Sequence, residues 1–191
     1  MSRPLKVVGV SGSLHEPSRT TALVRAILAE VGARIEIEPT LIEVAALGPG
    51  FAGALHRDQV APAVEEALQL IESADLLVVG SPVYRASFTG LFKHLFDFVG
   101  QYDLVGTPVL LAATGGGERH ALIIEHQLRP LFGFFQALTL PLGVYASTED
   151  FGNDELTSPE VIRRVVQAVD GSLPLVEQAT RVRRSEYVTT W

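Results

Sequence analysis

A repeated unit, in which an apolar run is followed by a short polar loop and then by a helical pattern, constrains the fold most. Its first copy has an apolar run at 7–10, a loop of Gly and hydroxyl residues, and a helical pattern that begins near residue 20. Apolar runs at 75–80 and 108–113 also end in loops of this kind. Continuous apolar runs are typical of parallel strands that are buried on both faces. Strands alternating with helices therefore predict a doubly wound parallel sheet.

The rest of the chain supplies further elements at the spacing that this fold needs. We predict an edge strand over 34–42, because apolar and polar side chains alternate there. The other expected segments are helices over 62–73, 89–99 and 119–138, loops over 45–60 and 152–158, a weak fifth strand over 139–145, and a last helix over 159–179 that is interrupted near 171–174.

Length and composition place these elements in one domain. A chain of 191 residues can bury a core of its own, so we predict one domain over residues 1–191, with a tail that is loosely ordered from about residue 181. The sequence contains no cysteine, which excludes disulfides and thiolate metal sites. Its five histidines show no metal-ligand spacing, and no metal site is expected.

The balance of apolar and charged residues bears on partners and location. Hydrophobic residues make up 47% of the chain and charged residues 19%, which indicates buried contacts between subunits. We found no apolar window long enough to cross a membrane and no signal peptide, so we expect a cytoplasmic protein. The formal charge of −7 argues against nucleic acid as a partner.

The loop that follows the first strand is suited to an anion. The N-terminus of the next helix offers free N–H groups and the positive end of the helix dipole. Ser11, Ser13, Ser18 and Thr20 add hydroxyls, and Arg19 adds a planar cation. Neither a Gly-Lys-[Ser/Thr] ending nor Gly-x-Gly-x-x-Gly is present, so a terminal phosphate monoester is favoured over a bridging pyrophosphate. The alternative is an ordinary polar turn that caps the helix.

The second and third loops, at 81–87 and 114–117, are suited to a flat ring. Pro82 stiffens the second loop, Tyr84 offers a flat surface, and the third loop is rich in glycine. Loops at the carboxyl ends of parallel strands share one edge of the sheet, so a phosphate and a planar ring at that edge indicate FMN. Alternatively, Tyr84 is a packing residue and the glycines form a strand-to-helix turn. Because the flavin carries the chemistry, we predict no catalytic side chain.

Three segments, 12–20, 81–84 and 113–116, together resemble the NAD(P)H-dependent FMN reductase family, which has a flavodoxin-like fold. The likeness spans about 6–146 and is strongest to the reductase components of alkanesulfonate and methanesulfonate two-component monooxygenases. It implies a five-stranded parallel sheet with helices on both faces, hydride transfer from NAD(P)H to flavin N5, and release of reduced FMN to a partner monooxygenase. The residues implied to hold the FMN phosphate are Ser11, Ser13, Ser18, Arg19 and Thr20. Those implied to hold its ring are Pro82, Val83, Tyr84, Arg85, Ser87, Thr114, Gly115 and Gly116.

One departure from the resemblance lies in the helix expected over 119–138. The alkanesulfonate reductases have an inserted Tyr in a π-helical turn at a tetramer interface, where this chain has His126. Pro130 has no N–H to bond the carbonyl of His126, so we predict a kink or π-bulge. His126 is a possible modulator, or it is simply exposed beside a proline kink.

The same helix predicts a homodimer or homotetramer. Residues spaced alternately by three and four along this helix form one packing seam, which consists of Ala121, Ile124, Leu128, Leu131, Phe135 and Leu138. Four further apolar residues lie outside the seam and exceed what one packing face needs: Leu122, Ile123, Phe132 and Phe134. The alternative is a larger core beneath the C-terminal helix.

Two other functions remain open on this fold. One is a quinone, azo-dye or chromate reductase with tightly held FMN, and the other is a flavodoxin-like electron carrier. No fingerprint for the nicotinamide ribose is present. The likeness to the methanesulfonate type favours NADH over NADPH.

Overall fold

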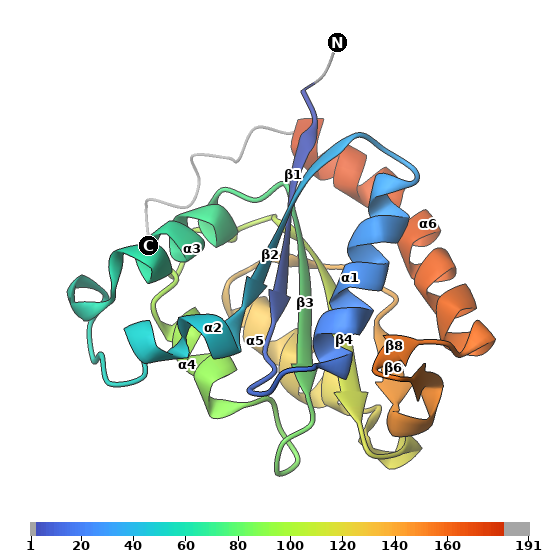
Figure 1. The fold of residues 1–191 in the computed structure, drawn as a ribbon. Coiled ribbons are helices and arrows are strands. Elements are labelled where there is room, and N and C mark those ends of the chain that lie inside the picture. Colours follow the sequence, from blue (N-terminus) through green and yellow to red (C-terminus); the bar gives the residue numbers. More distant parts are fainter. Residues whose placement is uncertain (1–2, 182–191) are drawn as a thin grey trace.

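A parallel sheet forms the centre of the computed structural model, which describes residues 3–181 (Figure 1). The strand order is β2-β1-β3-β4-β5, and β6 pairs with β4 further along the same edge. This 2-1-3-4-5 order is the flavodoxin-like arrangement, and it confirms the predicted fold class. The strands are β1 (Leu5–Ser11), β2 (Ile37–Glu43), β3 (Leu76–Pro82), β4 (Pro108–Gly115), β5 (Leu138–Thr139) and β6 (Val144–Ser147).

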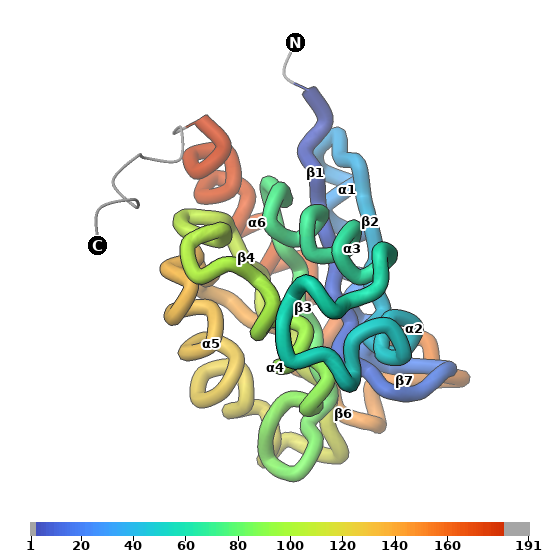
Figure 2. The backbone as a smooth tube through the Cα atoms, turned by 90° about the vertical axis from the view of Figure 1, so that its left-hand side faces the viewer, coloured from blue at the N-terminus to red at the C-terminus, as the bar shows by residue number. Residues whose placement is uncertain are grey.

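Helices cover both faces of the sheet, as Figures 1 and 2 show. One layer consists of α1 (Arg19–Gly32) and α6 (Pro159–Arg181). The other layer consists of α2 (Val44–Leu47), α3 (Pro62–Glu72), α4 (Gly90–Asp97) and α5 (Arg129–Phe134). Short 3₁₀ turns lie at Gly48–Gly50, Arg57–Gln59, Glu118–His120 and Thr148–Asp150.

The strand β3 shows why its sequence lacks alternation. Leu77 and Val79 face the core beneath α3, α4 and α5, whereas Leu76 and Val78 face the core beneath α1 and α6. Successive side chains of a strand point to opposite faces, and here both faces are covered. The prediction of a strand that is buried on both faces is confirmed.

The predicted fifth strand over 139–145 is wrong in one respect, because it is divided into β5 and β6. β5 pairs with Pro108 and Val109, and β6 pairs with 112–115 of β4. Between them the chain leaves the sheet, and arginines satisfy its carbonyl groups. Arg129 Nη1 donates to Leu140 O at 3.0 Å, and Arg164 Nε donates to Gly143 O at 3.1 Å.

The continuous helix predicted over 119–138 is also wrong, although the predicted break is confirmed. The segment contains a 3₁₀ turn at Glu118–His120, a π-helix at Ile124–Leu128 and the short helix α5. Pro130 cannot donate a backbone hydrogen bond to the preceding turn. This missing donor accounts for the π-helical geometry just before it.

The C-terminal region differs from the sequence expectation in two places. α6 continues through Gly171–Pro174 without interruption, because Val169, Ser172 and Val176 are buried against the core and tertiary packing outweighs local helix propensity. The expected loop over 152–158 contains a two-stranded antiparallel ribbon formed by β7 (Phe151–Gly152) and β8 (Glu155–Leu156). The tail predicted from about residue 181 lies outside the described residues.

Candidate functional site

A cavity of about 410 Å³ lies at the carboxyl ends of the strands and draws on all three predicted loops. Ser13, Ser18, Arg19 and Thr20 line it from the loop after β1 and the start of α1. Pro82 and Val83 line it from the end of β3, and Thr114 and Gly115 from the end of β4. Because β1 and β3 are neighbours from which the chain proceeds in opposite directions, this edge is the topological switch point where such sheets bind ligands.

The first turn of α1 is built to present donors to this cavity. Ser18 is the N-cap, and its hydroxyl accepts from the Thr21 N–H at 3.1 Å. The remaining N–H groups of a first helical turn have no partner within the helix. Arg19 is exposed at the cavity wall, so the helix end combines free N–H groups, hydroxyls and a cation.

A buried hydrogen bond joins the first loop to the third. Thr20 Oγ1 lies 2.6 Å from Thr114 Oγ1, and both side chains are buried. Val83 N–H donates to Thr114 O at 2.7 Å, which also ties the second loop to the third. The three loops are therefore held together by direct bonds beneath the cavity.

Ser11 lies beneath the cavity rather than on its wall. Its side chain is fully buried, and its hydroxyl lies 2.8 Å from Thr21 Oγ1. The neighbouring Gly12 is required by close packing, since a Cβ there would lie 2.7 Å from Phe92 Cδ2. Ser11 therefore supports the loop in this structure and does not line the cavity.

The second loop turns away from the cavity after Val83. Tyr84 and Ser87 exchange backbone hydrogen bonds across a two-residue turn, in which Arg85 and Ala86 have φ of 51° and 69°. Tyr84 is 51% exposed, and none of Tyr84, Arg85 and Ser87 lines the cavity. Ser87 instead donates its hydroxyl hydrogen bond to Gln127 Oε1 of the π-helix at 3.0 Å.

The third loop is held close to β6 by Tyr145. The Tyr145 hydroxyl donates to Gly117 O at 2.6 Å, and burial raises the pKa of this phenol, so it remains a donor at neutral pH. A Cβ at Gly115 would lie 2.5 Å from Tyr145 Oη, so a larger residue there would have to displace the Tyr145 hydroxyl. Gly116 is exposed and lies outside the cavity lining. His120 Nδ1, adjacent to Gly115, is a buried nitrogen without a hydrogen-bond partner among residues 3–181.

Sequence reasoning missed the contribution of the segment after β6. Ser147, Thr148, Phe151 and Asp154 line the cavity, and so do His15 and Pro17 of the first loop. The hydroxyl residue Ser147 ends the strand β6 and Thr148 follows it, which is the same signal that identified the other loops. Asp154 gave no signal, because only the folded ribbon brings its carboxylate to 3.3 Å from Arg19 Nε.

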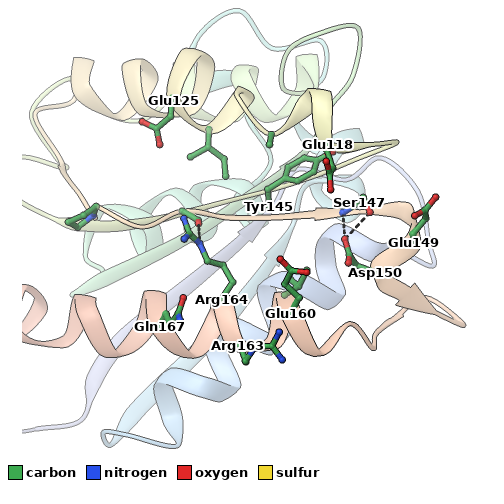
Figure 3. Close-up of a pocket in the computed structure, with 15 residues that line it drawn as sticks. Glu118, Glu125, Tyr145, Ser147, Glu149, Asp150, Glu160, Arg163, Arg164 and Gln167 are labelled. Atoms are coloured by element: carbon green, nitrogen blue, oxygen red, sulfur yellow. Dashed lines mark hydrogen bonds between the residues drawn. The ribbon is translucent and has the colours of Figure 1, made fainter.

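A larger cavity of about 680 Å³ lies along β6, between the π-helical region and α6 (Figure 3). Carboxylates from several elements line it, including Glu118, Glu125, Glu149 and Glu160, and Arg163 and Arg164 lie on the α6 side. This excess of negative charge disfavours a phosphate. The smaller cavity at the switch point is therefore the better candidate for a phosphorylated ligand.

Three further observations concern the remaining sequence predictions. His126 is exposed on the π-helix, away from the cavity lining. Across residues 3–181, no group of three or more His, Asp or Glu side chains is placed to hold a metal ion. Nor does that part of the chain form a helix with the length and apolarity needed to cross a bilayer.

Comparison with known proteins agrees with this geometry. Residues 5–152 match the family described as NADPH-dependent FMN reductase. An NADH-dependent FMN reductase SfnE of Pseudomonas putida is 52% identical, over 97% of this chain and all of its own length. An FMN reductase (NADPH) of Pseudomonas aeruginosa is 50% identical over 92% of this chain and 94% of its own.

A solved structure agrees as well. An oxidoreductase from Corynebacterium diphtheriae is 34% identical and superposes with a TM-score of 0.79, over 92% of this chain and 99% of its own. The matches in sequence and in fold lead to one conclusion. This chain belongs to the NADPH-dependent FMN reductase family.

Proposed function

We propose that this protein uses NADH to reduce FMN, and that it releases the reduced flavin to a partner monooxygenase. The observation that carries the proposal is the meeting of three strand-end loops around one cavity, with the N-terminus of α1 and Arg19 at its wall. FMN is treated as a substrate that binds and leaves. When bound, it accepts hydride from the nicotinamide.

The donor set of the cavity fits a phosphate monoester. We assign the phosphate to Ser13, Ser18, Arg19 and Thr20, together with the free N–H groups of the first turn of α1. Ser11 supports this loop from below. Pro82, Val83, Thr114 and Gly115 form a wall with few protruding polar groups, and we assign the flavin ring to this side of the cavity.

Residues that turn away from the cavity in this structure receive a different assignment. Tyr84, Arg85 and Ser87 form an exposed turn that contacts the π-helix, and Gly116 is exposed next to Gly115. We propose that they border the ring or the nicotinamide when both are bound.

The names of similar proteins give different nicotinamide specificities. The Pseudomonas putida relative is named as NADH-dependent, and the Pseudomonas aeruginosa relative as NADPH-dependent. The NADH-dependent relative is 52% identical over 97% of this chain, and the NADPH-dependent relative is 50% identical over 92%. We therefore favour NADH.

We also propose a homodimer or homotetramer that uses the broken helix. Ile123 and Phe132 lie outside the packing seam predicted for this helix, and both are buried within the chain. Leu122 and Phe134 remain 62% and 60% exposed, and they are the apolar surface left for a second subunit. Light scattering of the wild type and of Leu122→Lys would test this assignment.

Nicotinamide oxidation by the dialysed protein tests the main proposal. We expect turnover with NADH to require added FMN and to saturate with it, at a higher kcat/KM than with NADPH. Retained FMN, with turnover only when a quinone or an azo dye is added, would instead indicate an acceptor reductase. Bound FMN that cycles with a chemical reductant but not with either nicotinamide would indicate an electron carrier.

A further inference from the structure

The ribbon formed by β7 and β8 places a carboxylate at the proposed phosphate site. Asp154 Oδ1 lies 3.3 Å from Arg19 Nε, and both residues line the same cavity. Their side chains are 38% and 43% exposed, so the cavity opening leaves both accessible. A carboxylate next to the cation that binds the phosphate would weaken phosphate binding, so it is not expected in a site that retains FMN.

The ribbon is anchored at its base, so this placement is not that of a free loop. The Thr157 and Ser158 N–H groups both donate to Asp150 O, at 2.9 and 3.1 Å. The Asp150 carboxylate accepts from Ser147 N at 2.7 Å and from Ser147 Oγ at 2.8 Å. Although burial opposes ionisation of Asp150, these hydrogen bonds lower its pKa, and the anchor is in place at neutral pH.

The backbone at the tip of the ribbon also fixes Asp154. Asn153 and Asp154 have φ of 50° and 63°, as the two central residues of a tight turn between paired Gly152 and Glu155. Asn and Asp tolerate this left-handed region better than other residues that carry a side chain. An Asp154→Asn substitution therefore removes the charge and keeps the turn.

We propose that Asp154 competes with the flavin phosphate for Arg19 and thereby sets a low affinity, so that FMN leaves after reduction. This inference rests on the proposed function, and it names a residue that weakens the retention of FMN. The guanidinium pairs with the carboxylate when the phosphate is absent. A phosphate must displace this pairing, and it also meets a like charge at close range.

Flavin titrations of wild type and Asp154→Asn test the proposal, with FMN and riboflavin as probes and flavin fluorescence as the signal. We expect Asp154→Asn to lower the Kd for FMN by about 2- to 5-fold at low salt, and to leave the Kd for riboflavin unchanged. The difference should shrink at high salt, because exposed charges are screened. The matched control is Glu155→Gln, which removes an exposed charge of the same ribbon that does not line the cavity.

A second background separates competition for Arg19 from simple repulsion. In the Arg19→Met background, the gain in FMN binding free energy caused by Asp154→Asn should fall to less than half of its value in the wild-type background. An undiminished effect in that background would overturn the competition.

The outcomes also distinguish this inference from the proposed function. If wild type binds FMN more tightly than riboflavin and Asp154→Asn binds FMN no more tightly than wild type, the role of Asp154 is refuted while the phosphate site stands. If wild type and Asp154→Asn both bind the two flavins equally, the phosphate site itself is refuted, and the role of Asp154 with it.

Discussion

The buried hydroxyl pair Thr20–Thr114 can be tested for its role in holding the candidate site together. Its oxygen atoms are 2.6 Å apart, and the two residues are 2% and 6% exposed. Thr20→Val removes one hydroxyl without changing the shape of the side chain, and it leaves Thr114 Oγ1 buried without this partner. A buried polar group that loses its partner costs about 1–3 kcal/mol. Thr114→Val, which leaves Thr20 Oγ1 without this partner, should lower the free energy of unfolding by a similar amount.

The double variant provides the decisive comparison. With both hydroxyls replaced, neither is left unsatisfied, so the free energy of unfolding should fall by no more than in the more damaging single variant. The coupling energy should therefore be about 1 kcal/mol or more. Equilibrium urea unfolding followed by circular dichroism measures these differences, and each kcal/mol corresponds to about 2–4 °C in Tm for a chain of this size.

A matched control is Thr40→Val, at a half-buried position on the edge strand β2, which should change stability by less than about 0.5 kcal/mol. The reasoning fails if the two single variants cost no more than this control, or if their effects simply add. Either result would mean that the pair does not join the first and third loops energetically.

Three further predictions follow from charges and backbone conformation. Arg19→Ala should weaken FMN binding by about 1.5–3 kcal/mol and riboflavin much less, and equal losses in flavin titrations would remove Arg19 from the phosphate site. Ala86→Gly should raise the free energy of unfolding by about 1 kcal/mol in urea, because φ is 69° there and a Cβ is disfavoured in that region; a loss of stability would contradict this. Hydrogen bonds from Arg57 lower the pKa of Glu65 to about 2 from 4.5, so this contribution to stability is complete above about pH 4.5 and is lost as the pH falls towards 2. In acid unfolding, the advantage of wild type over Glu65→Gln should narrow across that window, and a constant difference would argue against the ion pair.

The central strands could be predicted because local sequence and burial agree. β1, β3 and β4 are continuous apolar runs, and each ends in a loop whose residue types suit a ligand. Parallel strands bring such loops to one edge, so the meeting of the loops after β1, β3 and β4 follows from sequence order alone. The break before Pro130 was equally local, since it depends only on a missing N–H.

Other features could not be predicted because distant parts of the chain determine them. α6 remains helical through Pro174 because its buried face is held against the sheet. The fifth strand divides where Arg129 and Arg164 satisfy carbonyl groups that leave the sheet. In both places, contacts made only after folding override the local preference.

The sequence by itself determined the doubly wound parallel class and the sheet edge that carries the candidate site, since both follow from the periodicity of apolar residues and from the ends of the buried strands; the flavodoxin-like type came from the family resemblance. Only the tertiary structure decided which predicted residues line the cavity. It buried Ser11 beneath the cavity, turned Tyr84 away from it, and brought Asp154 from a late ribbon to Arg19. The physical reason is that a hydroxyl or a charge acts according to what lies within hydrogen-bonding distance, and that distance is set by packing rather than by position in the sequence.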